Sequence, residues 1–168
     1  KRLQKGDFIM SVETARAHLA RFGRDQDILL LDQSSATVEL AAQALGTEDR
    51  RIAKTLSFGT KEGPILIVAA GDARIDNAAY KAFFHEKAKM LSPEEVLEYT
   101  SHPVGGVCPF GVPENVRVYL DESLRRFAIV YPACGSGASA IALTCDELAQ
   151  YSGALQWVDV CKGWRDAE

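Results

Sequence analysis

The sequence predicts one domain of mixed α/β (α+β) class, in which helices surround a mixed, largely antiparallel sheet or a partial barrel. Its 168 residues are close to the commonest size of a compact domain. Short runs typical of strands alternate with amphipathic segments, and hairpin-like turns join several of these runs, which fits a strictly parallel sheet poorly. We assign the domain to residues 11–168 and treat residues 1–10 as an N-terminal extension.

The predicted helices are marked by their capping residues. Ser, Thr and Asp side chains accept hydrogen bonds from the first free amides of a helix. On this basis, helices should begin after Ser11, Thr37, Asp76, Ser92 and Thr144. The last two caps are followed by Glu95 and Glu147, which complete capping boxes, and Gly23, Gly46 and Gly153 mark helix ends.

The predicted strands begin with a hairpin. Residues 52–58 and 65–70 are apolar and flank the glycine-containing turn 59–64. Further strands are expected at residues 116–120, 127–131 and 139–143, paired antiparallel, and at residues 155–160. Residues 102–111 are too rich in glycine and proline for regular structure but too apolar for a solvated linker, which indicates a shaped loop.

Composition and charge exclude several classes of protein. No run approaches the ~18 apolar residues of a membrane span, and the first residues lack the apolar core of a secretory signal, so we expect a cytoplasmic protein without a membrane partner. The formal net charge of −4 argues against wrapping DNA or a long stretch of RNA, so any RNA contact should be local. The four cysteines form no Cys-x-x-Cys pair and the three histidines are far apart, so we expect no metal and no cofactor.

Lys54 is the first candidate for chemistry. It lies within an apolar strand, where a buried ammonium group needs an anionic or carbonyl partner. The alternative is that Lys54 lies on the solvent face of the strand, with its amine in water.

The loop from Gly105 to Pro109 is the second candidate, because glycine lets backbone amides approach a ligand closely. A tight structural turn is the alternative for this loop.

Three other patterns point less clearly to a function. Residues 135–140 match a dinucleotide fingerprint, but the residues that follow alternate like a strand, and the remaining chain is too short for a dinucleotide fold. Ser136 and Ser139 lie in no G-x-S-x-G elbow, which argues against a serine nucleophile. His102 could orient a substrate or take a proton near neutral pH, although a single loop histidine is more often a surface residue.

Three segments taken together resemble a known family. They are the strand Ile52-Ala53-Lys54-Thr55-Leu56, the loop Gly105-Gly106-Val107-Cys108-Pro109-Phe110-Gly111 and the later glycine turn at residues 135–137. In this order and at these separations they are similar to the YbaK and prolyl-tRNA-synthetase-associated editing domains, over residues 11–160. The resemblance implies a YbaK-like fold and a trans-editing aminoacyl-tRNA deacylase. Its partners would be the acceptor end of tRNA bearing an amino acid and, as a second candidate, prolyl-tRNA synthetase.

The resemblance also implies roles for residues of this chain. The catalytic residues would be Lys54, which matches the functional lysine, and Gly105, at the start of the G-x-x-x-P loop. The substrate-binding residues would be Thr55, His102, Gly106, Val107, Pro109, Phe110, Gly135 and Ser136. Hydrolysis would need no metal and no covalent intermediate. In our hypothesis, water attacks the ester, loop amides stabilise the oxyanion, Lys54 anchors the substrate and the terminal ribose hydroxyl assists proton transfer.

The amino acid that would be cleared stays open among cysteine, alanine, serine and threonine, carried by tRNA for proline. Thr55 follows Lys54 as in cysteine-selective members of the family, whereas several alanine-selective members carry asparagine there. The loop departs from the cysteine-selective pattern, because Val107, Cys108 and Phe110 make its wall more apolar.

Two alternative functions are compatible with the same sequence. The first is a non-catalytic module of the same fold that binds tRNA or a synthetase. The second is a thiol-dependent redox or sensor protein that uses Cys108 or Cys134, both of which lie beside glycine or proline in expected loops.

Overall fold

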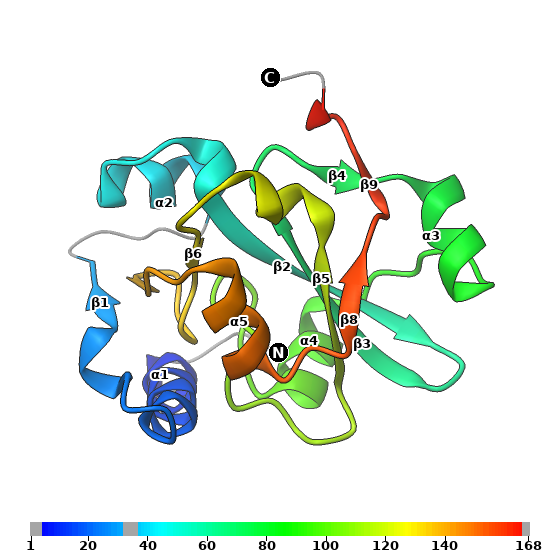
Figure 1. The fold of residues 1–168 in the computed structure, drawn as a ribbon. Coiled ribbons are helices and arrows are strands. Elements are labelled where there is room, and N and C mark those ends of the chain that lie inside the picture. Colours follow the sequence, from blue (N-terminus) through cyan, green and yellow to red (C-terminus); the bar gives the residue numbers. More distant parts are fainter. Residues whose placement is uncertain (1–4, 32–36, 166–168) are drawn as a thin grey trace.

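The computed structural model describes residues 5–31 and 37–165 and is built around a five-stranded sheet (Figure 1). The strand order is β6-β2-β3-β5-β8. The bounds are β2 (Ile52–Thr60), β3 (Gly63–Ala70), β5 (Arg117–Asp121), β6 (Tyr131–Pro132) and β8 (Gln156–Val158). The longest ladder, β2 with β3, is antiparallel, whereas β6, β5 and β8 each join their neighbours in parallel. The predicted mixed sheet is therefore confirmed.

Two small antiparallel ribbons form separate two-stranded sheets. One pairs β1 (Leu29–Leu30) with β7 (Ser139–Ala140), and the other pairs β4 (Arg74–Ile75) with β9 (Cys161–Lys162). Short 3-10 helices connect elements at η1 (Asp25–Asp27), η2 (Asp49–Arg51) and η3 (Glu122–Arg126).

Five α-helices lie around the sheet in the described part of the chain. They are α1 (Lys5–Ala20), α2 (Val38–Leu45), α3 (Asn77–Phe84), α4 (Pro93–Thr100) and α5 (Cys145–Ser152). The caps predicted for the last four are confirmed, because Thr37, Asp76, Ser92 and Thr144 all accept hydrogen bonds from first-turn amides. The helices α2 and α3 lie at opposite ends of the molecule (Figure 1). None of the helices among the described residues has the length and apolar character of a membrane span.

The first helix differs from the prediction. It begins at Lys5, six residues before Ser11, so Ser11 is an interior helical residue and not the N-cap. The Ser11 side chain is 1% exposed and hydrogen-bonds to His102, a partner 91 residues away that the local sequence could not reveal. Residues 5–10 of the expected extension therefore belong to α1, and residues 1–4 lie outside the described residues.

The strands after the central loop also differ from the prediction. We expected antiparallel pairing of residues 116–120, 127–131 and 139–143. The first run forms β5, which instead lies parallel to β3 and β8. The other two runs meet only at an isolated antiparallel bridge between Val130 and Leu143. The core centres on β3, because residues 65–70 are fully buried on both faces of the sheet.

Candidate functional site

A pocket of about 160 Å³ opens beside the start of β2. One wall is a face of α2, and the opposite wall combines the loop after α4 with the segment around β6 and β7. The lining residues are Thr37, Val38, Ala41, Leu45, Ile52, Ala53, Lys54, Thr55, Gly105, Val107, Tyr131, Ala133 and Ala140. Lys54 and Gly105, the two expected catalytic residues, thus face the same cavity.

The Lys54 amine is held at this pocket by backbone carbonyls. Lys54 lies on β2 opposite Ala69 of β3, and its Nζ donates hydrogen bonds to the carbonyl of Gly71, at 3.3 Å, and to that of Ala73. Burial lowers the pKa of Lys54, and nearby acidic groups, including Asp72, partly oppose that shift. An ammonium group has three donors, so these two bonds leave one donor for a ligand.

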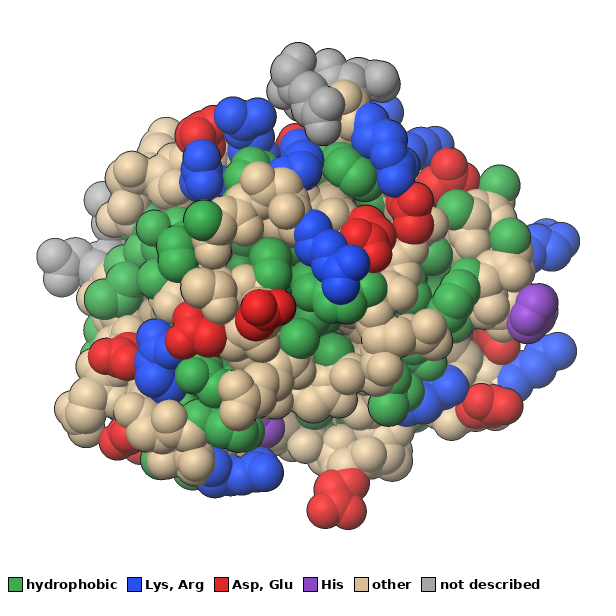
Figure 2. Space-filling view, in the orientation of Figure 1, with side chains coloured by type: hydrophobic (Ala, Val, Ile, Leu, Met, Phe, Trp, Pro, Cys, Tyr) green, Lys and Arg blue, Asp and Glu red, His purple; other side chains and the backbone are tan. Residues whose placement is uncertain are grey.

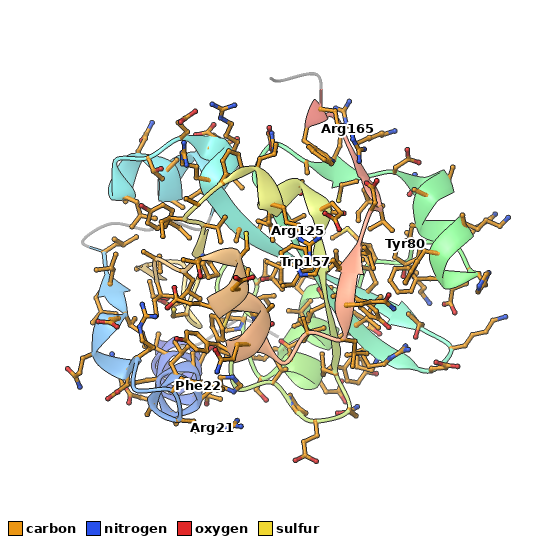
Figure 3. The ribbon with its side chains drawn as sticks, viewed as in Figure 1. Arg21, Phe22, Tyr80, Arg125, Trp157 and Arg165 are labelled. Atoms are coloured by element: carbon orange, nitrogen blue, oxygen red, sulfur yellow. The ribbon has the colours of Figure 1, made fainter. Side chains whose placement is uncertain are left out.

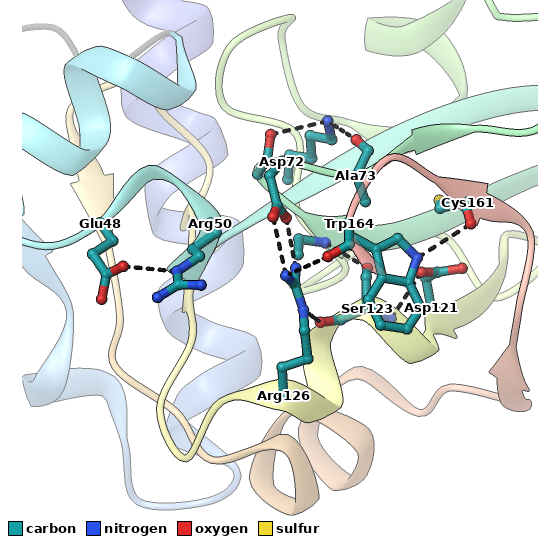
Figure 4. A network of polar contacts seen from close by, with 12 residues as sticks. Glu48, Arg50, Asp72, Ala73, Asp121, Ser123, Arg126, Cys161 and Trp164 are labelled. Carbon is teal, nitrogen blue, oxygen red and sulfur yellow. Dashed lines mark hydrogen bonds and ion pairs between the residues drawn. The ribbon is translucent and has the colours of Figure 1, made fainter. Parts of the chain in front are cut away.

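The turn that carries these carbonyls is itself anchored (Figure 4). Arg126 binds the carboxylate of Asp72 through both terminal nitrogens, at 2.6 and 3.0 Å, and donates to the carbonyl of Trp164 at 3.2 Å. Both side chains of the ion pair are largely buried, and such two-point contacts fix geometry as well as adding energy. The position of the Lys54 amine therefore depends on Arg126, which does not line the pocket.

Glycines bring three backbone segments into direct contact behind the pocket. A Cβ placed on Gly106 would lie 2.6 Å from backbone atoms of Gly135 and Ser136. A Cβ on Gly135 would lie 2.4 Å from the carbonyl oxygen of Ser11. The loop, the glycine turn and α1 are thus stacked backbone against backbone, which only residues without side chains permit.

The amide of Gly105 is available at the pocket wall. Gly105 has φ 91°, a left-handed conformation that favours glycine. The next amide, of Gly106, already donates to the carbonyl of Pro103 at 3.0 Å, whereas among the described residues the Gly105 amide has no acceptor. The hydroxyl of Thr55 is also buried without a described partner. The Gly105 amide therefore leaves hydrogen-bonding capacity for a ligand.

His102 holds the loop together and does not contact the pocket. Its ring is fully buried, and burial lowers its pKa, which favours the neutral form. Nε2 lies 2.6 Å from the carbonyl of Phe110, so Nε2 carries the proton and donates, and Nδ1 accepts from the hydroxyl of Ser11. The structure thus places His102, an expected substrate-binding residue, as a support for the loop, and the ring is not a surface residue.

The structure divides the expected site residues into two groups. Lys54, Thr55, Gly105 and Val107 line the pocket. The remaining six do not line it and form the support behind it: His102, Gly106, Pro109, Phe110, Gly135 and Ser136. The Ser136 hydroxyl, for example, accepts from the amide of Ala138 at 3.2 Å and so belongs to the glycine turn.

Sequence reasoning missed the helical wall of the pocket. Val38, Ala41 and Leu45 lie on one side of the helix predicted after Thr37, which we expected, like the other helices, to surround the sheet. Instead these residues line the cavity, together with Tyr131 and Ala133 from the far side. Helical periodicity identifies an apolar face but not whether that face meets a sheet or a cavity.

The thiols named in the redox hypothesis are inaccessible. Cys108 and Cys134 are fully buried, and burial raises the pKa of Cys108 to about 12 and that of Cys134 well above its ordinary value. Because the thiolate is the reactive form, this environment argues against redox chemistry at either residue. No group of three or more metal-ligating side chains occurs within residues 5–31 and 37–165.

The fold is that of a known class of protein. Residues 32–151 match the model of the aminoacyl-tRNA editing domain, and the chain belongs to this family. The chain is 53% identical over 156 residues to the Bacillus subtilis protein YwhH, covering 92% of this chain and 99% of that protein. It is 30% identical over 109 residues, 64% of this chain and 66% of the other, to an Enterococcus faecalis protein named "Putative Cys-tRNA(Pro)/Cys-tRNA(Cys) deacylase EbsC".

One solved structure is similar over nearly the whole chain. It is described as "a putative trans-editing enzyme for prolyl tRNA synthetase" and superimposes with a TM-score of 0.83 at 30% identity. The match covers 96% of this chain and all of the other. The expected YbaK-like editing fold is confirmed by this similarity and by the family match.

Proposed function

We propose that the chain is a trans-editing deacylase that hydrolyses the ester bond of misacylated tRNA. The observation that carries the proposal is the meeting of Lys54 and Gly105 in one small pocket. Membership of the editing family and the names of two relatives support the same reaction class. The reaction belongs to translation and so to the cytoplasm, and prolyl-tRNA synthetase is the candidate source of the mischarged tRNA.

Each polar group at the pocket has a role in the proposed reaction. The ester carbonyl lies against the Gly105 amide, which donates to the oxygen as negative charge develops on it during attack by water. The free donor of Lys54 Nζ binds an oxygen of the terminal nucleotide and holds the ester in place. The neighbouring ribose hydroxyl of the substrate relays the proton: it accepts the proton that leaves the attacking water and gives its own proton to the departing ester oxygen.

The pocket favours a small aminoacyl group. Its volume of about 160 Å³ is well below the 300–1,000 Å³ typical of pockets for drug-sized ligands. Val38, Ala41 and Val107 give it apolar walls. We propose cysteine, alanine, serine or threonine on tRNA for proline as the substrates.

The test is hydrolysis of a panel of tRNAs for proline charged with each of these four amino acids. Purified wild-type protein should deacylate at least one of them. Lys54→Ala should lower kcat/KM at least a hundredfold, whereas Lys162→Ala, which removes an exposed lysine on β9, should leave it unchanged. A Lys54→Ala rate equal to the wild-type rate would refute the mechanism.

The second candidate is a binding module of the same fold without catalysis. It predicts that the purified chain binds tRNA or prolyl-tRNA synthetase but hydrolyses none of the four substrates. Lys54→Ala would then change affinity alone, so the same panel, with binding measured in parallel, separates the two functions.

A further inference from the structure

We propose that a basic and aromatic surface at the hairpin end of the sheet binds the phosphates and unpaired bases of tRNA that adjoin its aminoacylated end. This surface, the hairpin patch, consists of Lys61, Phe83, His85, Lys87, Lys89 and Arg117. The inference rests on the proposed function and adds a second contact for the same RNA, at a distance from the pocket.

The patch is basic although the chain is acidic. The formal net charge of the whole chain is −4, yet residues 81–89 contain three lysines and a histidine against one glutamate. Lys61, at the tip of the β2–β3 hairpin, borders the same surface. Figure 2 shows basic side chains and a histidine at the edge of the molecule where α3 lies in Figure 1. This local excess of positive charge fits a polyanion such as RNA.

The lysines of the patch have no ion pair with a described residue, although carboxylates lie near them. Glu62 binds Arg117 at 3.1 Å, and Glu86 accepts from the backbone amide of Lys61 at 3.3 Å. Glu95 accepts from the amide of Ser92 in its capping box. The ammonium groups of the patch are therefore free to meet phosphates without first breaking an internal pair.

An exposed aromatic ring lies among these charges. Phe83 is 39% exposed and meets Phe84 and Tyr119 edge to face, with centroids 4.8 and 6.2 Å away. Phe84 in turn contacts the buried ring of Tyr80, with centroids 4.6 Å apart. Tyr80 lies on the inner side of α3 (Figure 3). The rings behind Phe83 hold it in place, and its outer surface borders a hollow of about 410 Å³ between α3 and the hairpin. A fixed aromatic ring beside cations is the arrangement on which unpaired bases stack.

The strand β2 connects the patch to the pocket. Lys54 lies near its start and Thr60 at the hairpin end, so at about 3.3 Å per residue the two are about 20 Å apart. That distance corresponds to about six stacked nucleotides, or fewer in an extended strand, at about 3.4 Å per nucleotide. An RNA whose aminoacyl group occupies the pocket can therefore reach the patch with its terminal nucleotides.

The first test measures binding of uncharged tRNA for proline at several salt concentrations. The triple variant Lys61→Glu/Lys87→Glu/Lys89→Glu should raise Kd at least tenfold. It should also lower the slope of log affinity against log salt by about 2, at about 0.7 for each lost phosphate contact. Phe83→Ala should weaken binding about tenfold with little change in slope. Lys162→Glu makes one such charge reversal outside the patch and should alter Kd less than twofold.

The second test separates the patch from the catalytic proposal. The triple variant should lose kcat/KM on full-length aminoacyl-tRNA but keep it on an aminoacylated CCA trinucleotide, and its Tm should match that of wild type. If the wild-type protein hydrolyses neither substrate, the proposed deacylase function is refuted. The binding data on uncharged tRNA would still test whether the hairpin patch binds tRNA. Equal Kd and salt slope in the triple variant and Lys162→Glu would overturn the patch. The proposal would also be overturned if the triple variant bound tRNA normally but no longer bound purified prolyl-tRNA synthetase, because the patch would then bind a protein partner.

Discussion

Gly106→Ala should displace the pocket wall although Gly106 does not line the pocket. The added Cβ would lie 2.6 Å from the carbonyl carbon and oxygen of Gly135 and from Cα of Ser136, where ordinary contacts are 3.4–4 Å. All three atoms belong to backbone, so relief requires the loop and the glycine turn to separate by about 0.8 Å. Strain of this kind costs about 1–3 kcal/mol of the free energy of unfolding. For a domain of this size, that lowers Tm by roughly 3–10 °C.

The same displacement should reduce activity. Gly105 and Val107 flank the substituted residue and line the pocket, so the wall moves relative to Lys54. A misplacement of about 1 Å can cost about a hundredfold in rate, and we expect kcat/KM for deacylation to fall by that order.

The assay combines thermal unfolding with deacylation, and Gly59→Ala is the matched control. A Cβ on Gly59 would meet only the flexible end of Leu91, at 3.4 Å, so this variant should keep the wild-type Tm and rate. A wild-type Tm for Gly106→Ala would refute the backbone contact. A lowered Tm with an unchanged kcat/KM would refute the link between the loop position and the reaction.

Three further predictions concern the support of the site. Arg126→Lys removes the two-point contact to the turn, so kcat/KM should fall about tenfold while circular dichroism stays that of the folded protein. In the unfolded chain His102 is protonated near its ordinary pKa of 6.5, whereas the buried ring of the folded protein is protonated only at lower pH. The free energy of unfolding should therefore fall as the pH drops below about 6.5. His102→Gln should reduce this dependence on pH, measured by denaturant titrations at several pH values. Cys108 and Cys134 should react with a thiol reagent only after the protein unfolds, because both are buried. Replacing both with alanine should leave the deacylation rate unchanged. A folded double variant without deacylase activity would support the thiol hypothesis.

The features predicted correctly from the sequence depend on near neighbours. The capping boxes at Ser92 and Thr144 and the hairpin of β2 and β3 each involve residues close together in the chain, so composition and spacing reveal them. The resemblance to the editing family likewise rests on short segments.

The features that were missed depend on distant contacts. Ser11 looks like an ideal cap, but the helix continues through it and its hydroxyl meets His102. The parallel pairing of β5 with β3 and β8 is set by how the sheet closes on its core, and strand-like composition does not specify direction. The α2 wall was missed because an apolar helical face indicates that the face is buried, but not whether a sheet or a cavity lies against it.

The contact of Gly135 with the carbonyl of Ser11 determines which residues a truncated version of the protein must include. The family match begins at residue 32, after α1 has ended, so a clone trimmed to the matched region would omit the first helix. Such a fragment would retain every residue that lines the pocket but lose the surface on which the glycine turn rests and the hydroxyl that orients His102. Expression trials and domain swaps should therefore carry the helix along with the catalytic segment.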